Sequence, residues 1–226
     1  MIIVPYTGSP RFEKRAQMIE HLREEGKIDT AEFDANNGKG LDKLFLEQLT
    51  GQLQFKGFKD GKILTESYRV RLKIRTPTYE LFERSRLYPG GRRVSQSPTF
   101  ESSVSDMFKR SGWSISESME FGETAWATLY RGIRQELEPP EDEFPLDRIE
   151  LKTTEPLVDE EESSVYPFVS RVFSYWFELN ITEDERLKLD TLFVRVISRT
   201  GNMLLMRGDE GVLIEREWVN HRRFHD

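Results

Sequence analysis

The sequence contains no cysteine, and this absence excludes several kinds of chemistry. Disulfide frameworks, thiolate zinc sites and cysteine nucleophiles all require a thiol. The chain also lacks a P-loop, a GxGxxG motif, a serine-elbow motif and an HExxH motif. A chain without cysteine fits a reducing compartment, so we expect an intracellular protein.

Long apolar runs are missing as well. No segment reaches the roughly 18 consecutive apolar residues that a membrane-spanning helix needs. The opening stretch MIIVPYTGSP has an apolar run too short for a signal peptide and no basic residues before it. We therefore expect no membrane partner. The net charge of −7 argues against broad affinity for nucleic acid, although a local basic patch is compatible with it.

The chain of 226 residues, 37% of them hydrophobic, is long enough for one sizeable domain with an extension. Apolar residues recur at helical spacing over 10–26 and again over 41–53. We expect an N-terminal helical extension at 1–60 and a second domain at 61–226. The extension is either a packing appendage or a docking surface for a protein partner.

The periodicity changes to two at the stretch ESYRVRLKIR, 66–75, which predicts a strand with one apolar and one basic face. Further strands are expected at 78–86, 113–116, 148–153, 168–181, 192–198 and either 203–206 or 211–214. Short helices are expected over 98–112 and after a capping box at Thr182 and Glu185, and the acid run 159–162 as a solvated loop. Helices and strands mix without regular alternation, which predicts an α+β fold or an α/β layer fold with a mixed sheet.

The stretch GETAWATLYRGIRQELE, 122–138, predicts an amphipathic helix. Its apolar stripe leaves Gly132, Gln135 and Glu136 together on another face, because these positions are three and four residues apart. The same helix follows the lead-in WSISESMEF, and Glu123 and Arg131 have seven residues between them.

These features resemble the Nudix box, whose pattern is Gly, five residues, Glu, seven residues, then Arg-Glu-aliphatic-any-Glu-Glu. The resemblance covers about 66–220 and implies a Nudix-like α/β/α sandwich with a mixed sheet. It also assigns a structural pair to Glu123 and Arg131, the aliphatic core position to Ile133, and the last metal-site glutamate to Glu136. The departures from the pattern are Glu117 for the leading glycine, Gly132 and Gln135 for two glutamates, and Glu138 with Pro139 for the closing pair.

The departures remove two of the three carboxylates that would hold a divalent cation. Mg²⁺ and Mn²⁺ are held by carboxylate oxygens, and hydrolysis of a diphosphate linkage depends on that ion. We expect weak Mg²⁺ or Mn²⁺ binding through Glu136 and the Gln135 carbonyl, with Glu136 as the residual catalytic residue. Gly132 costs roughly 1 kcal/mol of helix propensity relative to alanine. It either packs against another backbone or is the relic of a lost glutamate.

Basic residues concentrate in the first strand region, where arginine suits phosphate recognition. The ligand-binding candidates are Arg69, Arg71, Arg84 and Arg86, for which a solvated strand face is the alternative. Tyr88, Phe100 and Trp113 are candidates for stacking a base or for core packing. The tail NHRRFHD, 220–226, is expected to be a mobile or docking segment.

The preferred interpretation is a Nudix-like domain that binds a nucleotide, an RNA 5′ end or a protein partner with little or no hydrolysis. The N-terminal helices would contribute to the protein interface. One alternative is an active metal-dependent pyrophosphohydrolase that recruits other carboxylates, from Glu117, Glu120 or the acidic loop Glu141 to Glu143. A second alternative is an architectural subunit of a larger assembly.

Overall fold

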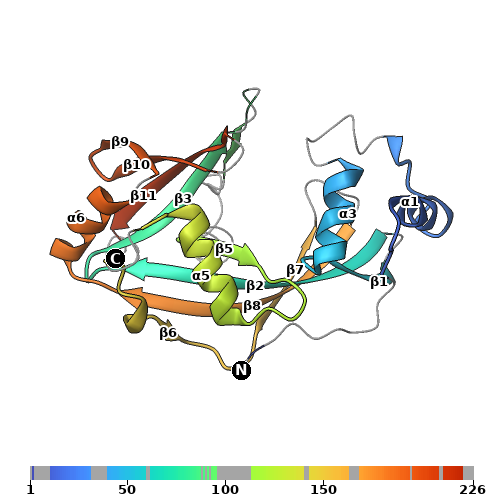
Figure 1. Cartoon of the computed structure of the whole chain (residues 1–226), viewed down its shortest axis with the longest axis horizontal. Coiled ribbons are helices and arrows are strands. Elements are labelled where there is room, and N and C mark those ends of the chain that lie inside the picture. The colour runs from blue at the N-terminus through green and yellow to red at the C-terminus, as the bar shows by residue number, and fades with distance from the viewer. Residues whose placement is uncertain are drawn as a thin grey trace. The chain divides into compact units, whose positions relative to one another are not determined.

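The computed structural model of the chain describes residues 2, 11–31, 40–59, 62–87, 89, 91, 93–95, 113–139, 143–162, 168–193, 195–208 and 211–220. Within these residues it contains both helices and strands (Figure 1). The helices are α1 (Arg15–Glu24), α3 (Leu41–Thr50), α5 (Ala125–Glu136), α6 (Glu183–Leu192) and the 3₁₀ turn η1 (Leu146–Arg148). The strands are β1 (Gln54–Lys59), β2 (Lys62–Arg75), β3 (Tyr79–Leu87), β4 (Arg93–Ser95), β5 (Ile115–Ser118), β6 (Glu150–Leu151), β7 (Leu157–Glu162), β8 (Phe168–Asn180), β9 (Val196–Thr200), β10 (Met203–Arg207) and β11 (Leu213–Asn220). None of the described helices has the length and apolar content needed to cross a bilayer.

The strands form a mixed sheet whose main path runs β6-β8-β2-β3-β11-β10-β9. Strands β1, β4, β5 and β7 pair beside that path. The pairs of β10 and β3 with β11 are antiparallel. β8 runs parallel to its neighbour β2, because Thr65 contacts Ser170 and, further along both strands, Tyr68 stacks on Phe173. The predicted mixed α and β class with a mixed sheet is therefore confirmed.

The chain divides into two compact units that each combine several segments. Unit 1 contains 1–70, 118–128 and 155–175, and unit 2 contains 71–117, 129–154 and 176–226. The two helices of the expected extension lie in unit 1, together with segments from much later in the sequence.

The core of unit 1 joins α1 and α3 to the strands. Met18 and Leu22 of α1 and Leu44 of α3 are fully buried, and they share a cluster with Phe55 of β1 and Phe168 of β8. The side chain of Gln48 accepts a hydrogen bond from the backbone N–H of Phe12 (3.0 Å) and donates one to its carbonyl (2.8 Å). The N-terminal helices therefore complete a hydrophobic core that the strands of unit 1 cannot bury alone.

The core of unit 2 lies between the second part of α5 and the strands. α5 begins after Thr124, whose hydroxyl accepts from the backbone N–H of Ala127 (3.1 Å) as an N-cap does. The predicted capping box of α6 is confirmed, since Thr182 and Glu185 each accept from the other's backbone N–H. The buried apolar side chains of this core include Leu72, Ile74, Leu81, Ile115, Leu129, Ile133, Leu137 and Phe177.

Several predicted elements differ from the structure. The strand expected at 148–153 covers only Glu150–Leu151 and follows the 3₁₀ turn Leu146–Arg148. The acid run 159–162 is part of strand β7, paired antiparallel with β8 (Asp159 with Val172, Glu160 with Arg171), and is not a loop. A run of acidic residues does not predict a strand by its composition, because the strand conformation depends on the cross-strand neighbours as much as on residue type. The strand expected at 192–198 begins at Val196, because α6 extends to Leu192. The helix expected over 98–112 lies outside the described residues.

Gly51 provides a stability test of unit 1, because it is left-handed (φ +87°) and an added Cβ would lie 2.4 Å from the Phe121 ring. Gly122, in the same unit, has φ +75° and open space around the same position. We expect Gly122→Ala to lower the free energy of unfolding by about 1–2 kcal/mol through backbone strain. Gly51→Ala should cost at least ~1 kcal/mol more, because it adds a clash.

Urea denaturation followed by circular dichroism measures both variants. Equal losses for Gly51→Ala and Gly122→Ala would show that the Phe121 contact does not constrain unit 1.

Candidate functional site

Glu136, the residue matched to the last metal-site glutamate, lies at the end of α5 and is bound by two arginines. Arg216 of β11 donates through one terminal nitrogen to Glu136 Oε2, and through the other to the Glu136 carbonyl oxygen (3.3 Å). Arg86 of β3 donates to Glu136 Oε1 at 3.3 Å. Both carboxylate oxygens of Glu136 therefore accept from guanidinium groups.

Glu83 of β3 completes what we call the arginine–glutamate cluster: Glu83, Arg86, Glu136 and Arg216. Arg86 binds Glu83 in a bidentate manner, at 2.6 Å and 2.8 Å. The strand register places Arg216 directly opposite Glu83, and their side chains approach to 3.6 Å. Two guanidinium groups thus lie among two carboxylates, so the formal charges of the cluster balance.

Three of the four members of the cluster are buried, while the Arg86 side chain is 31% exposed, and this burial decides the chemistry of the cluster. Arg216 is 0% exposed, Glu83 5% and Glu136 8%. Burial raises the pKa of Glu136, against the lowering effects of Arg216 and Arg86, while Glu83 and Glu117 raise it further. Charges in such a setting are tolerated only when they are paired and hydrogen-bonded. Removal of either carboxylate would therefore leave the arginine beside it without its counter-charge.

Gly132 is buried at a close approach between α5 and β5. A Cβ at this position would lie 3.2 Å from both Glu117 Cβ and Ile115 Cγ2. The structure therefore favours close packing as the reason for this glycine. The neighbouring atoms belong to side chains of β5, whereas the sequence predicted a neighbouring backbone. Any larger residue at 132 would require these two side chains to shift by a few tenths of an ångström. Gln135, by contrast, is exposed, and its carbonyl oxygen accepts from Arg131 at 3.4 Å.

The other residues matched to the box have structural surroundings. Ile133 is 1% exposed, within the core of unit 2. Arg131 pairs with Glu117 at 3.0 Å. Glu123 lies in unit 1, where its carboxylate accepts from the backbone N–H of Glu120 (3.1 Å). The predicted pairing of Glu123 with Arg131 stays a prediction.

The four ligand-binding candidates have different surroundings. Arg84 pairs with Glu217 at 2.5 Å, and Arg86 belongs to the arginine–glutamate cluster. Arg71 is buried with its guanidinium 5.4 Å from the centre of the Trp113 ring, and Arg69 is half-buried. A solvated strand face is therefore wrong for Arg71, because the indole covers it. The stacking candidates Tyr88 and Phe100 lie outside the described residues.

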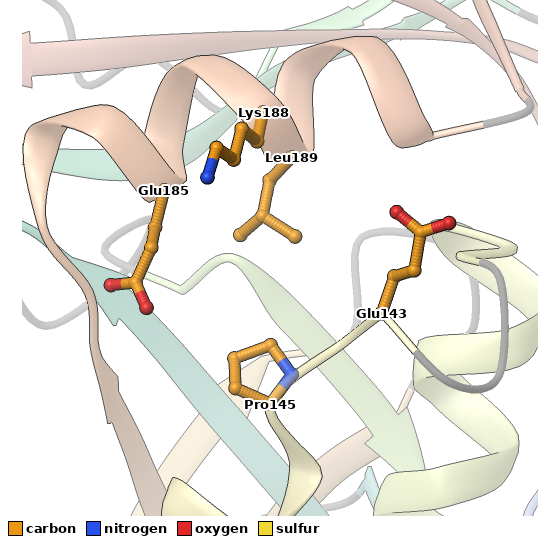
Figure 2. Close-up of a pocket in the computed structure, with 5 residues that line it drawn as sticks. All are labelled: Glu143, Pro145, Glu185, Lys188 and Leu189. Atoms are coloured by element: carbon orange, nitrogen blue, oxygen red, sulfur yellow. The ribbon is translucent and has the colours of Figure 1, made fainter.

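The alternative carboxylates lie in different places. Glu117 is paired with Arg131, and Glu120 accepts from Gln52 at 3.1 Å in unit 1. Glu143 lines a pocket of about 230 Å³ in unit 2. Figure 2 shows Glu143 and Pro145 on one side of this pocket and three residues of α6 on the other. The α6 residues are Glu185, Lys188 and Leu189. Glu141 and Asp142 lie outside the described residues. The pocket is smaller than the roughly 300 Å³ at which ligand sites begin.

Within the described ranges, no three histidine or acidic side chains are grouped so that they could hold a metal ion. No protein-family model matches this chain, and no curated protein matches it either.

The arginine–glutamate cluster holds the end of α5 against β3 and β11, because its arginines and glutamates have opposite charges. The oxygens that a divalent ion would use are occupied by guanidinium groups.

Arg216 and Glu83 were not among the predicted site residues, although the sequence pattern around Arg216 indicates that it is buried. In the alternating stretch LIEREWVN, Ile214, Arg216 and Trp218 share the face that is buried in the structure. A charged residue at an inward position requires a buried partner of opposite charge. That rule predicts a partner for Arg216 but does not identify it as Glu136, 80 residues earlier.

Glu136→Gln tests whether Glu136 has a structural role. The substitution keeps the shape but leaves Arg216 without its full counter-charge, so we expect the free energy of unfolding to fall by about 3 kcal/mol. Glu138→Gln is the matched control, because Glu138 pairs with Arg195 (2.9 Å) with its side chain 53% exposed, and should change stability by less than ~1 kcal/mol. Chemical denaturation measures both. A loss for Glu136→Gln no larger than the control would contradict the structural role.

Placing a glutamate at 132 and at 135 separately tests the packing account of Gly132. Gly132→Glu should lower the melting temperature clearly, because its Cβ would lie 3.2 Å from side-chain carbons of Glu117 and Ile115, and those side chains would have to shift. Gln135→Glu should leave it nearly unchanged, since the position is exposed and Arg131 lies beside it. Differential scanning calorimetry compares them, and equal melting temperatures would refute the account.

Proposed function

We propose that this protein contains a Nudix-like binding domain that recognises a nucleotide or an RNA 5′ end and has lost or strongly weakened hydrolysis. The observation that carries this proposal is that both carboxylate oxygens of Glu136 accept from Arg216 and Arg86. The Nudix relationship itself is supported by the box-like spacing on α5 and by the position of this helix directly after β5 in a mixed sheet.

A divalent ion at Glu136 would have to compete with two guanidinium groups. Mg²⁺ and Mn²⁺ need several oxygen ligands around them, and catalysis requires the ion to orient water and neutralise developing charge. In this cluster the positive charge beside Glu136 and Glu83 is supplied by arginine. An added cation would face repulsion from both guanidinium groups at short range. These charges support a domain that binds without hydrolysing.

Recognition of phosphate would depend on local cations, because the whole chain has a net charge of −7. Several of the arginines on β2 and β3 have carboxylate or aromatic partners, which limits how many of them can contact a ligand strongly. Arg71 and its neighbour Lys73 are the buried cations on β2. They are the best-placed candidates for holding a phosphate group within unit 2.

A paired assay tests binding against hydrolysis. We expect a panel of nucleoside diphosphates and capped or 5′-phosphorylated RNA to raise the melting temperature of the full chain. The same panel with millimolar Mg²⁺ or Mn²⁺ should release no phosphate above the protein-free control, because Glu136 is committed to its arginines.

The active alternative is a metal-dependent pyrophosphohydrolase that uses Glu136 with replacement carboxylates from Glu117, Glu120 or the loop Glu141 to Glu143. Metal-dependent phosphate release that disappears in Glu136→Gln, while Glu138→Gln retains it, would establish that alternative and overturn the proposal. A panel in which no member shifts the melting temperature would contradict the binding function.

A further inference from the structure

Two tryptophans of unit 2 have buried indole N–H groups for which the described residues provide no acceptor. These are Trp113, just before β5, and Trp176 on β8. Their rings lie 5.7 Å apart in an edge-to-face arrangement. Trp218 in the same unit has an acceptor, since its N–H donates to Asp190 at 2.8 Å. Buried indole N–H groups usually find a partner, so this pair requires an explanation.

Two cations of β2 lie beside the same tryptophans. The ammonium of Lys73 lies 4.9 Å from the centre of the Trp113 ring and 5.2 Å from that of Trp176. The guanidinium of Arg71 lies 5.4 Å from the Trp113 ring. We call Arg71, Lys73, Trp113 and Trp176 the tryptophan–cation cluster. All of its polar groups are hydrogen-bond donors, and two of its members carry positive charge.

The acidic groups near this cluster also form ion pairs with cations outside it. Glu80 lies 3.6 Å from the Lys73 ammonium, but it also pairs with Arg75 at 2.6 Å. Glu178 pairs with Arg75 at 3.2 Å and approaches Lys152 to 3.8 Å. Burial lowers the pKa of Lys73, which Glu80 partly offsets. An additional anion would stabilise the charged form of Lys73 and supply an acceptor for the indole groups.

The geometry also indicates which kind of ligand would fit. Cations lie over the rings of Trp113 and Trp176, and the N–H edge of each indole has no acceptor among the described residues. An N–H edge suits an oxygen acceptor, whereas a base would need an uncovered ring face. A metal ion would be repelled by Lys73 and Arg71. A group of hydrogen-bond donors with two cations suits an oxyanion with several oxygens.

We propose that the tryptophan–cation cluster is an oxyanion subsite that takes a phosphate group, which accepts hydrogen bonds from the indole N–H groups of Trp113 and Trp176 beside Lys73 and Arg71. The inference rests on the proposed function, in that it assigns the phosphate of a nucleotide or RNA 5′ end to this place. It concerns residues outside the arginine–glutamate cluster.

The test uses the full chain and inorganic pyrophosphate as the probe. Nitrogen-15 labelling gives one indole N–H resonance for each of the four tryptophans, and Trp126 and Trp218 serve as internal controls. We expect pyrophosphate to shift the resonances of Trp113 and Trp176 in a saturable manner while the two controls stay in place. Absence of saturable shifts, or equal shifts of all four resonances, would overturn the subsite.

Substitutions measured by calorimetry test the same contacts. Trp113→Phe and Trp176→Phe remove the N–H but keep an aromatic ring, and each should weaken pyrophosphate binding at least about tenfold, because a hydrogen bond to a charged group is lost. Trp126→Phe, on the exposed face of α5, is the matched control and should bind like the parent. If one variant fails to fold, the other variant and the resonance shifts of the parent chain still decide.

Nucleotide binding in the same variants separates this inference from the proposed function. If a nucleoside diphosphate binds the parent and both tryptophan variants equally, the subsite is wrong and the binding function stands. If the parent chain shows metal-dependent hydrolysis that needs Glu136, the proposed function fails, whatever pyrophosphate does at the tryptophans.

Discussion

The fold of unit 2 around α5 depends on the contact between Arg216 and Glu136. Arg216 is completely buried, and a buried guanidinium group is tolerated only beside a carboxylate. Glu136 is that carboxylate, and Glu83 and Arg86 complete the charge balance. Helix α5 is thereby joined through its last residue to β3 and β11. If Glu136 bound a metal ion instead, the buried charge of Arg216 would lose its partner.

The same helix also has local reasons for its residues at 132 and 135. At Gly132 an added Cβ would lie 3.2 Å from side-chain carbons of Glu117 and Ile115, and at Gln135 the exposed amide accepts a hydrogen bond from Arg131. Arginine supplies positive charge at Glu136 where a hydrolase would place a cation. The mixed sheet is therefore compatible with the proposed binding function, and the proposed oxyanion subsite uses different residues of the same unit.

Local patterns predicted much of the fold. The strand over 66–75, the helix within 122–138 and the capping box at Thr182 depend on neighbours in the sequence, and the structure confirms them. The expected basic face of that strand is not solvated throughout, since Arg71 and Lys73 are buried. The acid run of β7 was missed, because its strand conformation comes from pairing with β8. The candidate site was predicted in part: Glu136 was found, but its partners Arg216 and Arg86 come from distant strands. Pairing across 80 residues is set by sheet register, which one sequence does not reveal.

The measurement that tests the central claim most directly is the electron paramagnetic resonance of Mn²⁺ added to the full chain and to its Glu136→Gln variant. Mn²⁺ loses its free-ion signal when carboxylates bind it. The account predicts that the free signal is the same with either protein, because the arginines already hold the Glu136 oxygens. A signal that the parent chain depletes stoichiometrically and the Glu136→Gln variant leaves intact would contradict it.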